Sequence, residues 1–246
     1  AAYRRLGKPY FPKLLSGLPH TPATGPRLLA PPGEDAERIR HALVAAALEQ
    51  VAGHRLSSWH VAFPADHEVE LLRSHGLLVS HNVQFHWRNH GYGDFTDFLA
   101  TFNAERRRKV RAERRRVAES GLSIEVRYGD TMDPAEWPAL HHLYAATFAK
   151  YGNYAAFTPA SFADLASALG RRMVVFIARE RGDPVAISIC FRSDDTLYGR
   201  YWGTAANYHS LHFELCFYQG IDYCLRERLS TFEPGAGGEH KVARGF

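Results

Sequence analysis

The chain has 246 residues, of which 46% are hydrophobic and 13% are aromatic, and its formal net charge is +4. This composition excludes a disordered protein, and no apolar run reaches the ~20 residues of a membrane-spanning helix. The first residues lack the apolar run of a secretory signal, and the three cysteines form no paired spacing. We therefore expect a cytoplasmic protein whose thiols are reduced.

Residues 1–102 predict alternating strands and helices, because apolar side chains recur at strand or helix spacing between Pro and Gly breaks. Asp66 is expected to cap one helix, which Gly76 would end. The predicted elements are strands at 27–30 and 56–63, helices at 34–53 and 66–76, a long strand at 76–89 and a helix at 94–102.

Residues 103–121 predict a strongly basic helix that begins after Asn103 and stops at Gly121. Its basic side chains outnumber its glutamates, so the helix could follow the phosphates of an RNA or another anion. The side chains expected to do so are Arg107, Arg111 and Arg114. The alternative is a solvated helix stabilised by the pairs Glu105–Lys109 and Glu113–Arg116.

Residues 122–246 predict the order strand, helix, helix, three strands, helix, strand. An antiparallel meander followed by a helix and a further strand is the order of the GNAT acyltransferase fold, an α/β fold with a mixed sheet. The expected strands are 122–129, 172–180, 184–193, 196–203 and 230–234, and the expected helices are 134–152, 159–170 and 209–229.

Two stretches carry a resemblance to a known family. Residues 57–64 with 84–114, and residues 197–225 with 232–246, resemble the bacterial FemAB-like peptidoglycan biosynthesis/recognition family, a branch of the GNAT superfamily. Better known Fem-type relatives pair two GNAT domains and transfer an amino acid from aminoacyl-tRNA to a cell-wall precursor peptide.

The resemblance implies a division of the chain into parts of two tandem GNAT domains, both truncated. Residues 1–102 would be the C-terminal portion of a first domain, and residues 103–121 a basic connecting helix. Residues 122–246 would be the N-terminal portion of a second domain.

Acyl transfer of the GNAT type needs an activated donor, a deprotonated amine and a group that stabilises the oxyanion. The sequence has no G-x-S-x-G motif and no cysteine in an electropositive loop, as expected for transfer without a covalent nucleophile. Residues 203–209 lack the glycines of the loop that binds the pyrophosphate of CoA in GNAT enzymes. The donor is therefore open between acyl-CoA and aminoacyl-tRNA, and we expect no metal, because His209 and His212 lack further ligands at suitable spacing.

The end of the chain predicts a catalytic group. Glu233 ends the last expected strand, glycines follow, and Glu239, His240 and Lys241 then offer an acid, a base and an ammonium. The resemblance selects Lys241, because a lysine in a comparable late position lies beside the acceptor peptide in Fem-type enzymes. We expect Lys241 on an exposed loop, and the alternative is a loop that is merely polar.

Further polar and aromatic residues are predicted to bind the substrate. Arg200 lies in an aromatic strand, where it would point to a ligand or form an ion pair with Glu233 or Glu214. Alternation places Gln84, His86 and Arg88 on one strand face, which would line a cleft or meet solvent. The full set is Arg200, Tyr201, Trp202, His212, Glu214, Gln84, His86, Arg88 and Arg244.

The leading hypothesis is a Fem-like N-acyl or aminoacyl transferase acting on an amine of a peptide-like or cell-wall precursor substrate. With aminoacyl-tRNA as the donor, tRNA would be a partner. One alternative is a non-catalytic module that recognises peptidoglycan fragments. Another is an RNA-binding protein that uses the Arg-rich helix. The missing CoA loop favours the first alternative, and the basic helix favours the second.

Overall fold

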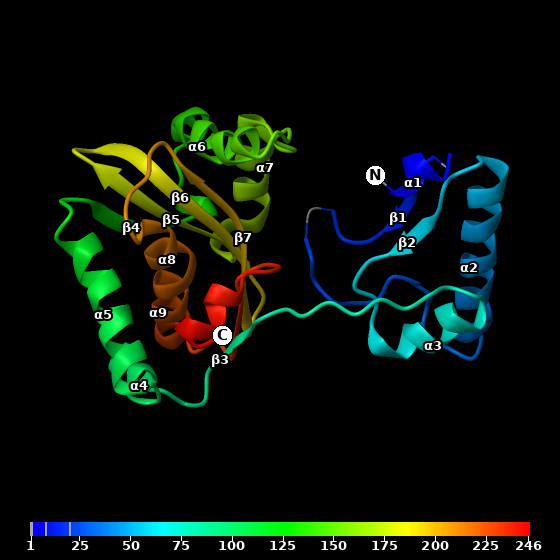
Figure 1. Cartoon of the computed structure of the whole chain (residues 1–246), viewed down its shortest axis with the longest axis horizontal. Helices are drawn as coiled ribbons and strands as arrows, with labels where there is room; N and C mark the ends of the chain where they lie inside the picture. The colour runs from blue at the N-terminus through cyan, green and yellow to red at the C-terminus, as the bar shows by residue number, and fades with distance from the viewer. Residues whose placement is uncertain (1, 8, 20) are drawn as a thin grey trace. The chain divides into compact units, whose positions relative to one another are not determined.

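Figure 1 shows the computed structural model, which describes residues 2–7, 9–19 and 21–246. The chain forms two compact units, residues 1–82 and 83–246. The predicted divisions after residues 102 and 121 do not coincide with this boundary. Helix α5 (Ala104–Ala118), the basic helix, buries Val110 and Val117 in the core of the second unit and is therefore part of it.

The first unit contains a two-stranded parallel sheet and an apolar cluster. Strands β1 and β2 pair along their length, so Leu14 lies opposite Trp59. Leu28, Val44 and Leu72 are buried together. The elements are α1 (Ala2–Arg5), β1 (Leu14–Ser16), α2 (Ala36–Gly53), β2 (Trp59–Val61) and α3 (Asp66–Ser74).

The predicted strand at residues 27–30 is wrong, and a buried carboxylate explains why. The N–H groups of Arg27 and Leu28 donate to Glu68 at 2.8 and 2.7 Å, so they are not available to a neighbouring strand. Glu68 also accepts a hydrogen bond from the N–H of Ala65. Ala65, and not the expected Asp66, is the N-cap residue of α3. Glu68 is fully buried, and its charge is matched by backbone donors.

The second unit is built on one mixed six-stranded sheet, in the order β3-β8-β7-β6-β5-β4. Strands β4 to β7 are antiparallel, β8 lies parallel to β7, and β3 lies antiparallel to β8. The predicted meander and the strand after it are thereby confirmed. The strands are β3 (Trp87–Arg88), β4 (Ser123–Tyr128), β5 (Met173–Glu180), β6 (Asp183–Arg192), β7 (Thr196–Thr204) and β8 (Thr231–Glu233).

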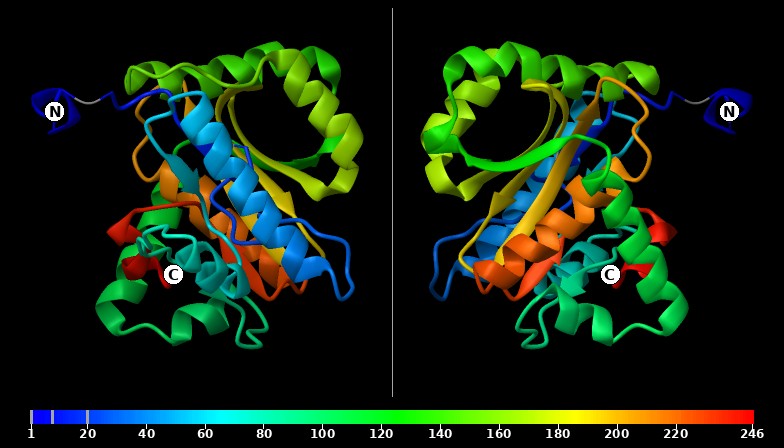
Figure 2. Two further views of the ribbon diagram at one scale, coloured as in Figure 1. Left: turned by 90° about the vertical axis from the view of Figure 1, so that its right-hand side faces the viewer. Right: turned by 90° about the vertical axis from the view of Figure 1, so that its left-hand side faces the viewer.

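Helices cover both faces of this sheet (Figure 1, Figure 2). Val174 and Phe176 of β5 pack toward α5, α8 and α9, whereas Val175 and Ile177 pack toward α6 and α7. Burial on both faces explains the unbroken apolar run of β5. The helices are α4 (Phe95–Ala100), α5, α6 (Trp137–Lys150), α7 (Pro159–Leu169), α8 (Leu211–Phe213) and α9 (Gln219–Arg226), with a π-turn η4 (Glu214–Tyr218) between the last two. No helix in residues 2–7, 9–19 and 21–246 has the length and apolar character to cross a membrane.

Two further predicted elements differ from the structure. In the predicted strand at 76–89, only Trp87 and Arg88 pair with another strand, and Leu78 is 99% exposed. The segment before Trp87 runs from one compact unit to the next, where it has no strand partner among the described residues. The predicted helix at 209–229 begins only at Leu211 and is interrupted by η4.

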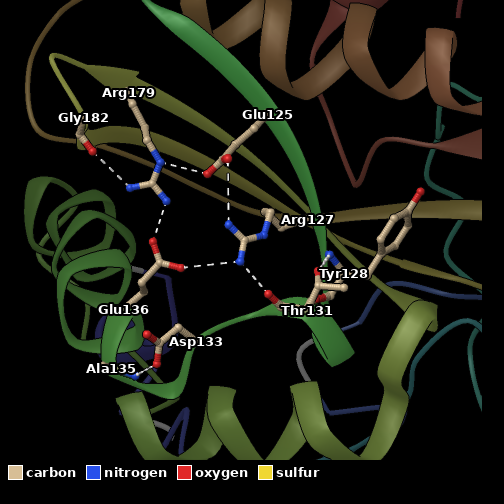
Figure 3. A network of polar contacts seen from close by, with 9 residues as sticks. All are labelled: Glu125, Arg127, Tyr128, Thr131, Asp133, Ala135, Glu136, Arg179 and Gly182. Atoms are coloured by element: carbon tan, nitrogen blue, oxygen red, sulfur yellow. Dashed lines mark hydrogen bonds and ion pairs between the residues drawn. The ribbon is translucent and has the colours of Figure 1, made fainter.

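An ion-pair network fixes the start of α6 to the edge of the sheet (Figure 3). Arg179 of β5 donates to Glu125 of β4 at 2.8 Å and to Glu136 at 2.5 Å, and Glu136 immediately precedes α6. Arg127 lies within 4.0 Å of the same two carboxylates. The network joins two strands to the start of one helix, and its four charges are paired with one another.

Candidate active site

The sheet of the second unit opens between β7 and β8, at a place that we call the fork. The two strands pair only from Thr196–Thr231 to Tyr198–Glu233. Directly afterwards, Arg200 is an extra residue in β7, because Gly199 lies opposite Cys190 and Tyr201 opposite Ile189. A bulge of this kind bends a strand and increases its twist, so it accounts for the separation of β7 from β8.

A cavity of about 210 Å³, the fork cavity, opens where the strands separate. It brings together β7, η4, α8 and the segment after β8, so residues distant in sequence share one surface. Of the predicted site residues, it is lined by Arg200, Tyr201, Trp202, His212, His240 and Lys241. Its other lining residues are Ser188, Gly199, Cys216, Phe217, Pro234, Ala236, Gly237 and Gly238.

Arg200 and Glu233 form a buried ion pair at the fork. Nη2 of Arg200 donates to Glu233 at 2.8 Å, and the two side chains are 2% and 7% exposed. The structure thus shows the ion pair that the sequence left open as one alternative. The pair joins β7 to β8 at the point where their backbone pairing ends.

The segment after Glu233 is a loop, residues 235–238, that requires its glycines. Gly235, Gly237 and Gly238 have φ values of 90°, 70° and 88°, which are strained for residues with a Cβ. Nζ of Lys241 donates to the carbonyl oxygens of Gly235 at 2.6 Å and Ala236 at 3.5 Å. The lysine therefore holds this glycine loop in place.

The expectation that Lys241 lies on an exposed loop is wrong, because the residue is 4% exposed. Burial lowers the pKa of its ammonium from the ordinary 10.5, against the attraction of Glu233. Among the described residues, its hydrogen bonds go only to backbone carbonyls. One positive charge at the cavity is therefore not matched by a direct carboxylate partner.

Two histidines at the fork cavity are neutral at neutral pH. The rings of His212 and His240 lie 6.1 Å apart. Burial, aided by His240, Arg244 and Lys241, lowers the pKa of His212 to about 4. Burial, aided by Arg244 and Lys241, also lowers the pKa of His240. A neutral imidazole can accept a proton, which is the property of a general base.

The stability of the second unit is predicted to fall as the pH is lowered from 6.5 toward about 4, the ordinary and folded pKa values of His212. Between these values the unfolded chain binds a proton that the folded chain does not, and above 6.5 the effect vanishes. The shift corresponds to about 3 kcal/mol at the acidic end. Urea denaturation at about pH 7 and about pH 4.5 measures the free energy of unfolding at each pH. The difference between the two values should be smaller for His212→Phe than for the wild type. An equal dependence in both proteins would contradict this role.

The three polar residues predicted on one strand face lie beside the fork without lining its cavity. Burial lowers the pKa of His86. The negative charge of Glu233 raises this pKa, whereas the positive charges of Arg88, Arg200 and Lys241 lower it further. Nε2 of His86 lies 3.2 Å from Oε1 of Gln84, and Arg88 donates to Thr231 at 2.6 Å. His86 is thus within electrostatic range of the fork, whereas Arg88 fixes β3 to β8.

Three predicted binding residues are held in ion pairs instead. Arg244 is 3% exposed and donates to both carboxylate oxygens of Glu113, at 2.6 and 3.1 Å, so the predicted pair of Glu113 with Arg116 is wrong. Arg114 donates to Asp222 at 2.6 Å and to Glu214 at 3.2 Å. Neither arginine has its guanidinium free for phosphate, and Glu214 lies outside the fork cavity.

The other predicted residues and the missed ones complete the site. Glu239 is exposed and outside the cavity lining, and Tyr201 also packs beside Tyr144 in the opposite core. Cys216 also lines the cavity and was not predicted. It follows His212 by four residues, a helical spacing that points to a shared face. Burial raises the pKa of the Cys216 thiol far above its ordinary value, so it stays protonated and is no nucleophile.

An antiparallel meander, a helix and a parallel strand that forks from the sheet define the GNAT-like acyltransferase fold. The model of the FemAB-like peptidoglycan biosynthesis/recognition family matches residues 1–246. The chain belongs to this family.

Two solved structures share the fold. One is the C-terminal domain of a protein from Agrobacterium fabrum assigned as lysylphosphatidylglycerol synthetase, with 15% identity, a TM-score of 0.57 and coverage of 85% of this chain and 63% of that one. The other is L-PGS from Bacillus licheniformis, with 10% identity, a TM-score of 0.52 and coverage of 80% and 57%. This chain thus spans less than two thirds of either. No curated protein matches the sequence.

Proposed function

We propose that the protein is an N-acyl or aminoacyl transferase that moves an acyl group onto an amine of a peptide-like or cell-wall precursor substrate. The observation that carries this proposal is the fork cavity, where two neutral imidazoles and an ammonium without a direct carboxylate partner line one surface. A base and a cation at one cavity are the groups that acyl transfer to an amine requires. Membership of the FemAB-like family supports a substrate related to the cell wall.

The proposed reaction uses His240 as the base. The amine nitrogen attacks the carbonyl carbon of the donor, a C–N bond forms, and the C=O electron pair moves to oxygen. His240 takes the proton that the nitrogen loses, and Lys241 stabilises the oxyanion. The oxyanion then collapses, the C–O or C–S bond to the donor breaks, and protonated His240 gives its proton to the departing oxygen or sulfur, which leaves as an alcohol or thiol. Arg200 and Glu233 act as positioning residues, since their ion pair fixes the two strands of the fork.

Aminoacyl-tRNA is the donor that we favour. The segment after β7, residues 205–209, contains no glycine for a pyrophosphate loop. Helix α5 presents an exposed basic surface that can meet phosphates. This surface consists of Arg108, Lys109, Arg111, Arg115 and Arg116.

The transfer itself can be tested with a lysine-containing peptide of the cell-wall precursor type and two labelled donors, acetyl-CoA and a mixture of charged tRNAs. Label should move to the peptide from the charged tRNAs, and Lys241→Met should slow the transfer by about tenfold to hundredfold, the effect of losing one charge-assisted hydrogen bond in the transition state. Transfer from acetyl-CoA alone would overturn the choice of donor. Peptide binding without transfer from either donor would instead support the alternative of a recognition module.

The basic surface of α5 is predicted to bind tRNA. Reversing Arg108, Arg111 and Arg115 to glutamate should weaken binding and reduce the slope of log affinity against log salt by roughly 2, because each lost phosphate contact removes about 0.7 to 0.9. Reversing three exposed arginines elsewhere in the unit, Arg172, Arg181 and Arg226, is the matched control. Filter binding over a range of salt concentrations measures both. Equal slopes in the two triple variants would favour the alternative in which α5 is a solvated helix that does not bind RNA.

A further inference from the structure

The basic surface of α5 leads to a second cavity, of about 400 Å³. Arg108, Arg111 and Arg115 are exposed, and their spacing of three or four residues places them in one row along the helix, which we call the arginine row. Ala118 continues the row and is also exposed. Because Arg115 and Ala118 both line the cavity, the arginine row ends at its rim, and a strand of phosphates on the row would reach the cavity.

The second cavity combines an apolar wall with a few polar side chains. The apolar wall consists of Val117, Ala118, Leu122 and Ile124, and the polar side chains are those of Arg114, Arg115, Glu214 and Gln219. This combination is typical of sites for small molecules or for single chemical groups of a larger ligand.

Arg115 is the lining arginine that is available to an anion. Its side chain is 70% exposed, and the carboxylate of Glu119 lies 4.0 Å away, which is a weak surface pair that a phosphate can replace. Arg114, in contrast, is held between the carboxylates of Glu214 and Asp222. The rim of the cavity therefore favours a ligand with a negative charge.

Gln219 supplies a hydrogen-bond acceptor in the wall. Its Nε2 donates to Oε1 of Glu214 at 2.8 Å, and this fixes the amide, because a carboxylate can only accept. Oε1 of Gln219 receives no hydrogen bond within the described residues, and it is not sealed from solvent as Oε2 of Glu214 is. The edges of adenine and cytosine carry an amino group that can donate to such an oxygen.

The second cavity also borders the helical segment of the proposed active site. Glu214 and Gln219 line the second cavity, whereas Cys216 and Phe217, which lie between them in the sequence, line the fork cavity. An RNA with its phosphates on the arginine row and its aminoacyl end at the fork cavity would pass close to η4. This placement favours a base of that RNA, rather than a free small anion, as the occupant.

We propose that the second cavity binds one unpaired base, adenine or cytosine, of an RNA strand whose phosphates lie on the arginine row. The ring packs against Leu122 and Ile124, and its amino group donates to Oε1 of Gln219. Unpaired bases suit such a site, because their faces and edges are not occupied by neighbouring bases. The proposal rests on RNA as the donor of the proposed function, but the binding itself needs no acyl group.

Two short labelled RNA strands test this site, one of oligo(A) and one abasic strand with the same sugar–phosphate backbone. Fluorescence anisotropy of the full chain over a range of salt concentrations measures the affinity for each. The wild type should bind oligo(A) about tenfold or more tightly than the abasic strand, with a similar salt slope, because the base adds contacts that involve no phosphate. Equal affinities for the two strands, or no binding of oligo(A), would overturn the proposal.

A change of the cavity alone separates the base from the phosphates. Ala118→Leu narrows the cavity and leaves every arginine in place, so it should remove the advantage of oligo(A) without changing the affinity for the abasic strand. Ala104→Leu, at an exposed position of the same helix outside the cavity lining, is the matched control and should bind both strands as the wild type does. An unchanged affinity for oligo(A) in Ala118→Leu, or an equal loss for both strands, would show that no base enters the cavity.

Gln219→Met tests the predicted hydrogen bond. Uracil carries a carbonyl oxygen where cytosine carries the amino group, so the wild type should prefer oligo(A) to oligo(U), and the variant should lose this preference. A retained preference would contradict the assigned contact. Base-dependent binding without acyl transfer from charged tRNAs would overturn the proposed function and leave this site standing. Transfer from charged tRNAs with equal binding of oligo(A) and the abasic strand would overturn this site alone.

Discussion

Replacing Arg244 by alanine is expected to destabilise the second unit by about 3 to 5 kcal/mol, the effect of breaking a buried ion pair. Arg244 and Glu113 are 4% and 8% exposed at their side chains, and two hydrogen bonds join them. Arg244 also donates to the carbonyl of His240 at 2.8 Å and lies 3.4 Å above the ring of Phe213. Without Arg244, Glu113 is a buried charge whose remaining hydrogen bond within the described residues comes from the hydroxyl of Tyr218.

Urea denaturation measures this loss of stability, and two controls give it meaning. The double variant Glu113→Leu with Arg244→Met removes both charges, so it should recover much of the stability. Arg115→Ala breaks only an exposed pair with Glu119 and should change stability by less than about 1 kcal/mol. A loss of that small size in Arg244→Ala would show that the buried pair does not support the unit.

Replacing His240 by alanine is expected to lower kcat by about a hundredfold or more, the range for loss of a general base. The folded unit should be little affected, because the side chain is exposed and Arg244 binds the backbone carbonyl of His240. The pH profile of the wild-type rate should include a rise that is complete below the ordinary histidine pKa of 6.5, since partial burial and two cations lower the pKa of His240. The alanine variant should lose this part of the pH profile.

Steady-state rates with the donor found active in the transfer assay measure the effect. His209→Ala is the matched control, because His209 is exposed and outside the lining of the fork cavity. Its kcat should equal that of the wild type. If His240→Ala keeps the wild-type kcat and pH profile, another group accepts the proton, and His212 becomes the candidate.

The order of elements in the second unit could be predicted from the sequence because its signals are local. Asn103, expected as an N-cap, does accept a hydrogen bond from the N–H of Arg106 at 2.9 Å. The three strands β5 to β7 also appear as predicted, since each needs only its neighbour in the chain to pair with. The predicted long strand at 76–89 was wrong because β propensity is also a local signal and does not supply a partner strand.

The candidate site was harder to predict because its geometry depends on distant contacts. Glu113 and Arg244 are 131 residues apart, so no local pattern indicates their pair. Lys241 follows glycines and charged residues, which is typical of an exposed loop, yet the carbonyls of the glycine loop bind its ammonium. The bulge at Arg200 depends on register with β6 and is likewise absent from any local pattern.

The π-turn η4 makes the helical segment from Leu211 to Arg226 sensitive to deletion. A π-turn holds one residue more than an α-helical turn, and one residue corresponds to about 100° of rotation. Deleting a residue within Glu214–Tyr218 would let the helix become regular, but its two ends could not both keep their neighbours. Either His212 would turn away from Trp202, or Asp222 would turn away from Arg114. The irregular turn is thus what allows one short helix to serve both contacts, and functional homologues should conserve its length more strictly than its residues.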